Sequence, residues 1–331
     1  MWTNAAIDYV FFLLEAITII AAIVVGFALI VAVLAKGRLP RHGSLVIKAL
    51  NKEYEKRKDQ MLSNILPKAE YKKAMKAENK VKKAANRHKK EHKRIFVIDF
   101  DGDIRATQVE ALSEEVNAIL SVADTGDEVV IKLDSPGGVV NGYGLAAAQL
   151  ARFRDSQIHL VAAVDQVAAS GGYMMASVAD QIIASPFAIV GSIGVVAQLP
   201  NFHRLLSNKG VDMELHTAGK YKRTLTMFGE NTDEGRHKFQ QELEEIHGLF
   251  KKHIETYRPS LNIEEVSTGE FWFGKTALSL NLVDHLMTSD EYLTNKYNAG
   301  DYDIFQVTWK MKKRPLLGLY HTALSLLSKR R

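Results

Sequence analysis

Apolar strand-like runs that alternate with helical stretches over residues 95–196 constrain the fold of this chain more than any other feature. The strands are predicted over residues 95–102, 128–133, 158–164, 181–184 and 189–196. The helices are predicted between them, over residues 107–123, 142–153 and 172–178. Strands that alternate with helices in this way form βαβ units. We therefore expect an α/β domain built on a mainly parallel sheet.

One serine, Ser170, precedes two glycines between the strand-like run that ends at Val164 and a stretch of small apolar residues typical of a buried helix. A serine on a sharp strand-to-helix turn has an exposed hydroxyl, and the N–H groups at the helix start can stabilise an oxyanion. Serine and glycine are also ordinary residues at helix starts. The turn is therefore compatible with either a nucleophile or a structural cap.

A second glycine turn, with Pro136, Gly137 and Gly138, follows the strand predicted over residues 128–133. Open α/β sheets bind their ligands at the carboxyl ends of parallel strands, which is where this turn would lie. A tight strand-to-helix connection alone would also explain the glycines. Two such turns at successive strands are more informative, because the N–H groups of Gly138 and Gly171 could then stabilise the same oxyanion.

A serine nucleophile needs a base, and the residues after Ser170 offer two kinds. His203 begins what is predicted to be an exposed amphipathic helix, and His216 lies in an alternating stretch predicted to be a strand, where a lone histidine is more often structural. Lys222 follows a short glycine-containing turn, and a lysine serves as a base when burial lowers its pKa. Lys220 lies beside it, and such basic clusters are usually solvated surfaces.

An uncharged apolar stretch near the N-terminus, residues 16–35, is long enough to cross a membrane. A helix of about 20 residues spans about 30 Å, the thickness of the hydrocarbon core of a bilayer. Asp8 and Glu15 precede the stretch and Lys36 follows it, whereas a signal peptide carries basic residues before its apolar run. We expect residues 1–35 to form a retained transmembrane anchor; a buried core helix is the alternative.

The positive charge of the chain is concentrated in residues 36–94. They contain 20 Lys/Arg and 6 Asp/Glu, although the whole chain has a formal net charge of only +5. Few glycines or prolines interrupt them, so we expect a basic helical linker that lies near anionic lipid headgroups or is simply solvated. No pattern of aromatic residues interleaved with the basic ones, as in nucleic-acid binding modules, occurs in this linker. By the positive-inside rule it belongs on the cytoplasmic side.

The rest of the chain divides into a globular domain over residues 95–300 and a basic amphipathic tail over residues 301–331. A long helix is predicted over residues 233–257, followed by an aromatic turn over residues 268–274. Core packing is the default for that turn; a wall of the substrate site or a subunit contact is the alternative. The chain has no cysteine, which excludes disulfides, thiolate nucleophiles and cysteine metal sites. We expect no metal and no cofactor.

Four motifs, in order, closely resemble the signal peptide peptidase A family and specifically its membrane-anchored SohB branch. They are Ser135-Pro136-Gly137-Gly138, Ala169-Ser170-Gly171-Gly172-Tyr173, Gly191-Ser192-Ile193-Gly194-Val195 and Gly219-Lys220-Tyr221-Lys222. The resemblance implies a ClpP/crotonase-like fold and a Ser/Lys dyad that hydrolyses peptide bonds. Carried over by motif, Ser170 is the nucleophile, Lys222 is the general base and then acid, and Ser192 orients the lysine. The N–H groups of Gly138 and Gly171 form the oxyanion hole.

The same resemblance implies a homo-oligomer in which neighbouring subunits complete the substrate grooves. We expect a peptidase of the bacterial inner membrane that acts on signal-peptide remnants or on unfolded or membrane-associated proteins, with the lipid bilayer as a partner and no nucleic acid. The resemblance suggests that the domain faces the periplasm, whereas the basic flank favours the cytoplasm. Two alternatives are an acyl-CoA enzyme of the crotonase type and a non-catalytic membrane scaffold.

Overall fold

The computed structural model of the protein describes residues 11–26, 43–87 and 93–311. The chain divides into two compact units. Residues 45–310 form the larger unit, which contains the α/β domain; residues 1–44 and 311–331 form the other.

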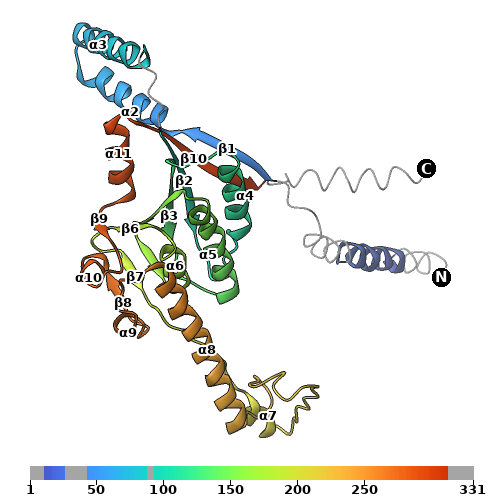
Figure 1. Ribbon diagram of the computed structural model, residues 1–331. Helices are drawn as coiled ribbons and strands as arrows, with labels where there is room; N and C mark the ends of the chain where they lie inside the picture. Colours follow the sequence, from blue (N-terminus) through green and yellow to red (C-terminus); the bar gives the residue numbers. More distant parts are fainter. Residues whose placement is uncertain (1–10, 27–42, 88–92, 312–331) are drawn as a thin grey trace, which may run out of the picture. The chain divides into compact units, whose positions relative to one another are not determined.

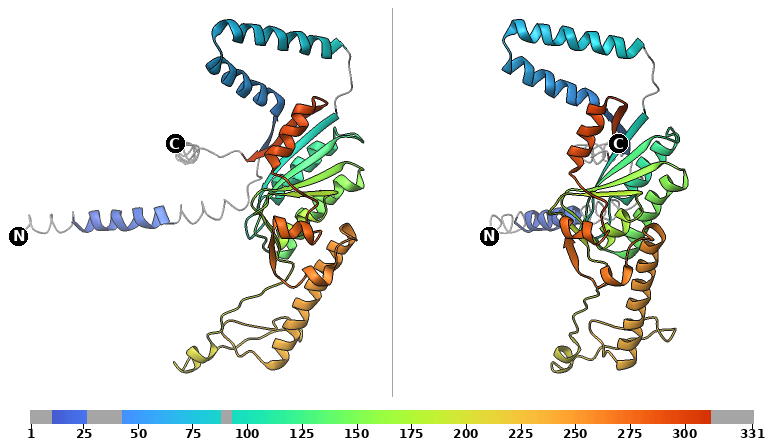
Figure 2. Two further views of the ribbon diagram at one scale, coloured as in Figure 1. Left: turned by 90° about the vertical axis from the view of Figure 1, so that its left-hand side faces the viewer. Right: turned by 60° about the vertical axis from the view of Figure 1, so that its left-hand side comes forward.

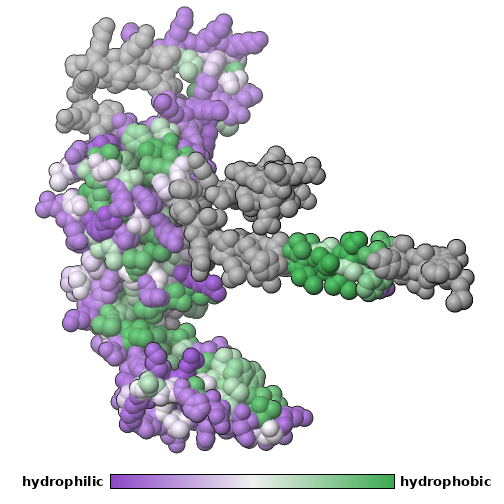
Figure 3. Space-filling view, turned by 90° about the vertical axis from the view of Figure 1, so that its right-hand side faces the viewer, coloured by the Kyte–Doolittle hydropathy of each residue, from purple (hydrophilic) through white to green (hydrophobic). Residues whose placement is uncertain are grey.

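The N-terminal unit contains a helix over residues 11–26. Its surface is almost entirely apolar (Figure 3), and large side chains such as Phe12 and Ile23 are each 64% exposed. Among the described residues, no helix has both the length and the hydropathy needed to span a membrane. The anchor expected over residues 16–35 overlaps this helix only in part, because residues 27–35 lie outside the described residues.

Helices and strands alternate along the α/β unit (Figure 1). In chain order the elements are β1 (Gly43–Ala49), α2 (Leu50–Ile65), α3 (Lys68–Arg87), β2 (Lys93–Asp101), α4 (Val109–Leu120), β3 (Glu128–Asp134), α5 (Val140–Asp155), β4 (His159–Val164), β5 (Val167–Ala169), α6 (Gly171–Ala176), β6 (Gln181–Ala184), β7 (Ile189–Gly191), α7 (His203–Ser207), α8 (Asp233–Tyr257), α9 (Ile263–Val266), β8 (Phe271–Phe273), α10 (Gly274–Ser279), β9 (His285–Leu286), α11 (Ser289–Ala299) and β10 (Tyr302–Met311).

Seven strands form the main sheet in the order β1-β10-β2-β3-β4-β6-β9, and every pair from β10 to β9 is parallel. A smaller sheet has the order β5-β7-β8, with β5 and β7 parallel and β7 and β8 antiparallel. The predicted α/β class with a mainly parallel sheet is therefore confirmed. In the register of the main sheet Asp101 lies beside Asp134, so β2 and β3 end at the same edge.

The central strands are apolar on both faces because both faces are covered. Phe96 and Ile98 of β2 pack into the larger core together with α4, α5 and α6. Ile95 and Val97, which alternate with them, pack into a smaller core that includes residues of α11. Figure 1 shows α4 and α5 on one side of the sheet and α11 on the other. Such two-sided burial is the usual environment of parallel strands.

Both ends of the α/β unit differ from the expected boundaries. β10 lies between β1 and β2 in the sheet, although residues 301–331 were expected to form a tail. β1 and α2 fall within the expected linker, yet Asn51 of α2 accepts a hydrogen bond from the N–H of Ile304 and donates one to the carbonyl of Tyr302, at 2.7 and 2.9 Å. Non-local pairing explains the difference, because a strand's partner cannot be seen in its local sequence. Residues 312–331 of the expected tail lie outside the described residues.

One predicted strand is shorter in the structure than expected, and another is not formed in the described residues. The strand predicted over residues 189–196 ends at Gly191, because Gly191 and Ser192 have φ values of 98° and 51° that turn the chain out of the extended conformation. The alternating stretch around His216 forms no strand. Met213 and Leu215 are each about half exposed there, so no neighbouring strand supplies the pairing that an isolated strand needs.

The long helix predicted over residues 233–257 is confirmed as α8. The Thr232 side chain caps it by accepting a hydrogen bond from the Gly235 N–H, at 3.1 Å. In the C-terminal half of α8, Phe250 and Ile254 are buried in the larger core. The N-terminal half lies away from the sheet together with α7 in both views of Figure 2. The helix thus joins the core to the segment between β7 and α8.

Glu115, a buried carboxyl group on α4, should make the domain less stable as the pH rises toward neutrality. Burial raises the pKa of Glu115 from 4.5 to about 7, although its side chain accepts a hydrogen bond from the N–H of Trp309 on β10. Between these two pKa values only the unfolded chain loses the proton, so stability falls by up to about 3 kcal/mol between pH 4.5 and pH 7. Urea unfolding at pH 5 and pH 8 measures the loss.

Glu115→Gln is the matched variant for this prediction, because its side-chain oxygen still accepts from Trp309 and it does not titrate. We expect the variant to lose less stability between pH 5 and pH 8 than the wild type. An equal loss in the two proteins would assign the pH dependence to other groups.

Candidate active site

Ser170 occupies a strained turn between β5 and α6. Its φ and ψ are 52° and −118°, a conformation that costs a non-glycine residue free energy and that clusters at functional sites. Two backbone hydrogen bonds hold the turn: the Ser170 N–H donates to the carbonyl of Gly191 at 2.8 Å, and the Ser170 carbonyl accepts from Met174 at 3.0 Å. The side chain lines a cavity and is only partly buried. The strand-to-helix turn expected at Ser170 is thus present.

The turn from Pro136 to Gly138 is fixed by a chain of hydrogen bonds beneath it. The Gly137 N–H donates to Ser135 Oγ at 3.1 Å, and Ser135 Oγ lies 2.5 Å from the Tyr143 hydroxyl. The Tyr143 hydroxyl donates to the carbonyl of Asp103 at 2.8 Å. Ser135 and the Tyr143 ring are fully buried, and burial raises the pKa of Tyr143, so its hydroxyl stays protonated and able to donate. This network gives the glycine turn a fixed position.

A backbone bridge joins the two glycine turns. The Ser135 N–H donates to the carbonyl of Val167 at 2.8 Å, and the Ala169 N–H donates to the carbonyl of Ser135 at 3.0 Å. Both turns therefore lie side by side, although β3 belongs to the main sheet and β5 to the smaller one. Neither the Gly138 N–H nor the Gly171 N–H has a hydrogen-bond acceptor within the described ranges. Both glycines line the cavity beside Ser170, so their N–H groups are available to a ligand.

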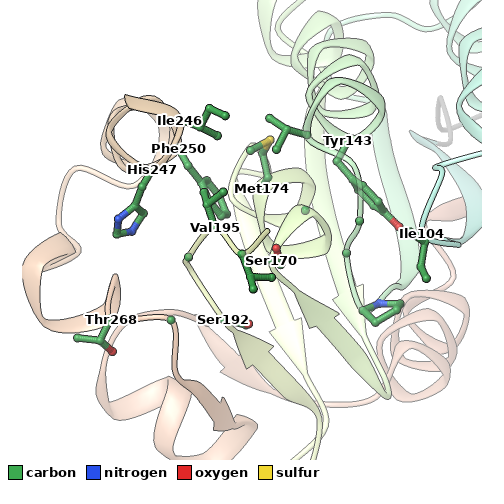
Figure 4. A pocket seen from close by; sticks show the side chains of 18 residues that line it. Ile104, Tyr143, Ser170, Met174, Ser192, Val195, Ile246, His247, Phe250 and Thr268 are labelled. Carbon is green, nitrogen blue, oxygen red and sulfur yellow. The ribbon is translucent and has the colours of Figure 1, made fainter. Parts of the chain in front are cut away.

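The cavity has a volume of about 710 Å³ and a mostly apolar lining. Ile104 and Val140 lie near the Pro136–Gly138 turn, and Met174, Ile246 and Phe250 come from α6 and α8. Figure 4 shows Ser170 in the middle of these walls, with Ser192 on the adjoining segment after β7. A cavity with apolar walls and a few polar groups is typical of a ligand site.

Ser192 lines the same cavity as Ser170 but comes from a different strand. Its N–H donates to the carbonyl of Glu270 at 2.7 Å, which ties the segment after β7 to the aromatic turn. Thr268 and Gly269 of that turn also line the cavity, and Trp272 packs against Gly191. The turn therefore combines two of the roles considered for it, core packing and a wall of the cavity.

Lys222 is the one proposed site residue that the structure does not bring to this cavity. Its side chain is exposed in the segment between α7 and α8, and it is not among the residues that line the cavity. Its neighbour Lys220 forms an ion pair with Glu234 of α8, with 2.7 Å between the amine and the carboxylate. This carboxylate raises the pKa of Lys220 further, so Lys220 stays protonated. A protonated amine cannot accept a proton, and Lys220 is therefore the weaker candidate for a base.

Sequence patterns missed three residues of the site. Tyr143 and Ser135 fix the glycine turn, and His247 of α8 lines the cavity. The helical periodicity of residues 233–257 places His247 next to Ile246 and three residues before Phe250, which would have suggested a position near the core. No signal in the sequence connects α8 with Ser170. In the described residues, no group of three or more histidine or acidic side chains is arranged to hold a metal ion.

Known proteins match the chain along nearly its whole length. The family model described as "Peptidase family S49 N-terminal" matches residues 4–150, and "Peptidase family S49" matches residues 152–301. A protein of Haemophilus influenzae named probable protease SohB is 44% identical over 325 residues, which cover 95% of this chain and 91% of that protein. The chain belongs to peptidase family S49. A second S49 relative, a probable protease SohB of Buchnera aphidicola, is 45% identical over 302 residues and covers 88% of this chain and 99% of its own length.

Membership of family S49 makes this protein a serine peptidase and confirms the resemblance to the SohB branch. The acyl-CoA enzyme and the scaffold are the disfavoured alternatives. A solved structure of the 1510-N membrane-bound stomatin-specific protease, in complex with a substrate peptide, is similar with a TM-score of 0.43 and 12% identity. That similarity covers 71% of this chain and 99% of the other.

Proposed function

We propose that this S49 peptidase is an endopeptidase with a Ser170/Lys222 dyad on a ClpP/crotonase-like domain. The observation that carries the proposal is the convergence of Ser170 with two free N–H groups, those of Gly138 and Gly171, in one apolar cavity. Preorganised N–H donors beside a nucleophile are what acyl transfer requires, because negative charge develops on the carbonyl oxygen in the transition state.

In the proposed reaction the Ser170 hydroxyl attacks a peptide carbonyl while Lys222, in its neutral form, accepts the hydroxyl proton. The resulting oxyanion accepts hydrogen bonds from Gly138 and Gly171. Lys222 then donates the proton to the leaving amine as the C–N bond breaks, which leaves an acyl-enzyme. Water, deprotonated by Lys222, hydrolyses the ester and restores the serine. Ser192 orients the lysine, whose flexible side chain would otherwise be a poor base.

The proposal requires the segment that carries Lys222 to close over the cavity. A lysine acts as a base only where it is desolvated, and the Lys222 side chain is exposed in the single chain. The chain between β7 and α8, which includes this segment, leaves large apolar side chains uncovered: Val196 is 91% exposed and Leu205 is 57% exposed. Exposed apolar residues of this kind mark interaction surfaces. We therefore propose that a homo-oligomer buries this segment and brings Lys222 to a cavity.

The mostly apolar cavity supports apolar segments of signal-peptide remnants or of unfolded and membrane-associated proteins as substrates. Anchoring in the bacterial inner membrane is part of the proposal and rests on the uncharged residues 16–35 and on the basic residues that follow them. The lipid bilayer would then be a partner of the chain.

Covalent labelling tests the proposed nucleophile. A fluorophosphonate probe reacts covalently with the nucleophilic serine of serine hydrolases, so it should label the purified full chain. Mass spectrometry should map the label to Ser170. Ser207 of α7 is exposed and lies outside the cavity, so Ser207→Ala should retain the label while Ser170→Ala loses it. A label on another serine would assign the nucleophile elsewhere, and the absence of any label would favour the scaffold.

A further inference from the structure

We propose that His247 binds the substrate main chain: its Nε2–H donates a hydrogen bond to a carbonyl group of the bound peptide. This inference rests on the proposed peptidase function and adds a substrate-binding residue to it. His247 lies on α8, and Figure 4 shows its ring on the α8 side of the cavity, apart from Ser170. The proposed role is therefore to hold the peptide away from the bond that is cleaved, and the base remains Lys222.

One ring nitrogen of His247, Nε2, has no hydrogen-bond partner in the part of the chain that the structure describes. Its Nε2 atom is buried, and no protein group within the described residues forms a hydrogen bond with it. A buried polar atom without a partner destabilises the fold, so such atoms are rare and call for an explanation such as contact with a ligand. His247 lines the cavity, and because its Nε2 atom is shielded from solvent, the ring must turn for this nitrogen to meet a group of the ligand.

A second histidine on the same helix provides the contrast. His253, six residues later, has its Nε2 atom 3.0 Å from the carbonyl oxygen of Met174, to which it donates. Burial lowers the pKa of His253, which favours the neutral ring, and the ring packs against Tyr257 with 5.0 Å between the ring centroids. His253 thus serves the packing of α8 on α6. His247 has no comparable internal contact for its Nε2 atom and faces the cavity.

The surroundings of His247 favour the main chain of the substrate as its partner. Ile246 and Phe250 of α8 and Val195 of the facing segment form an apolar wall around it. Such a wall accepts an apolar side chain, which cannot form a hydrogen bond with an imidazole. The peptide carbonyl next to that side chain would also be buried and would need a donor. Every residue of an extended peptide carries this carbonyl, so the interaction serves many sequences.

Peptide binding to Ser170→Ala tests the inference without requiring hydrolysis. The probe is a dye-labelled ten-residue peptide of leucine and alanine, and its Kd is measured by fluorescence anisotropy on the full-length chain in detergent. His247→Leu, which removes the donor, should raise the Kd by about five- to tenfold, the typical effect of one hydrogen bond. His247→Gln, whose side-chain amide can donate from a similar position, should keep the Kd within about twofold.

His253→Asn is the matched control, since it removes a histidine from the same helix outside the cavity lining. It should lower the melting temperature and leave the Kd within about twofold. An unchanged Kd for His247→Leu would overturn the inference. The Kd is then compared across a series of peptides with different side chains. If His247→Leu raises the Kd only for peptides that carry one particular side chain, the assignment to the main chain is overturned.

Turnover distinguishes a failure of this inference from a failure of the proposed function. With Ser170 restored, His247→Leu should raise the KM and leave kcat unchanged, because the hydrogen bond is the same in the ground and transition states. A short fluorophosphonate that does not extend to α8 should label Ser170 at the wild-type rate in this variant. Normal labelling of His247→Leu together with an unchanged KM would contradict the role of His247 alone. No labelling of the wild type would contradict the proposed peptidase mechanism.

Discussion

Ser170→Ala and Lys222→Ala should each lower kcat for the hydrolysis of unfolded casein by about 10³-fold or more, because the two side chains act as one unit. For the same reason the double variant should be little worse than either single variant. Lys220→Ala is the control: the ion pair with Glu234 keeps Lys220 protonated, so its loss should leave kcat within about twofold. Steady-state kinetics on the detergent-purified chain measures all four proteins.

The outcome for Lys222 decides whether the exposed segment takes part in the chemistry. Undiminished turnover in Lys222→Ala would show that the base lies elsewhere, and equal turnover in all the variants would point to a contaminating protease. Co-expression of Ser170→Ala with Lys222→Ala then reports which chain supplies the lysine. Restored hydrolysis means that the lysine acts on the cavity of a neighbouring subunit, and continued inactivity means that it acts within its own chain.

Gly138→Ala should lower kcat by about 10²- to 10³-fold, the usual cost of losing one oxyanion donor. A Cβ atom at this position would lie 2.0 Å from the carbonyl oxygen of Ile104, far inside contact distance. That oxygen accepts a hydrogen bond from the Val139 N–H at 2.8 Å, so it cannot move away without breaking this bond. The turn must shift instead, and the Gly138 N–H shifts with it.

Gly144→Ala on α5 is the matched control, because no atom lies within 4 Å of a Cβ atom built there. Alanine is also the better helix former, so this variant should be at least as stable as the wild type and equally active. Casein hydrolysis and the melting temperature are measured for both variants. Wild-type kcat in Gly138→Ala would mean that the Gly138 N–H does not contact the oxyanion.

Local patterns were sufficient to predict the central βαβ units and the long helix α8. The strands β2, β3 and β4 are continuous apolar runs, and the apolar residues of α8 recur at helical spacing, so each element carries its own signal. Turn chemistry likewise located Ser170 and Gly138. That both line one cavity depends on the bridge between Ser135 and Ala168, because Gly138 follows β3 of the main sheet and Ser170 follows β5 of the smaller sheet.

The remaining features depend on contacts that are distant in the sequence. The predicted strand ends before Ser192 because Ser192 has a positive φ value. No sequence pattern predicts that the carbonyl of Glu270 accepts a hydrogen bond from the Ser192 N–H. Tyr143 has the pattern of an ordinary core residue, and its role became visible only through its bond to Ser135. Lys222 lies on an exposed segment away from the cavity, and only the proposed oligomer would bring the two together.

The pairing of β10 with β2 has a consequence for biosynthesis. β10 begins at Tyr302, and β2, its parallel neighbour, was translated about 200 residues earlier. While the ribosome adds the intervening residues, one edge of β2 has no neighbour, although the elements around Ser170 are already available to pack. An uncovered strand edge presents unpaired N–H and C=O groups that can form hydrogen bonds with a strand of another chain. A nascent or prematurely terminated chain would therefore expose an unpaired strand edge that can aggregate, although the cavity around Ser170 could already have formed.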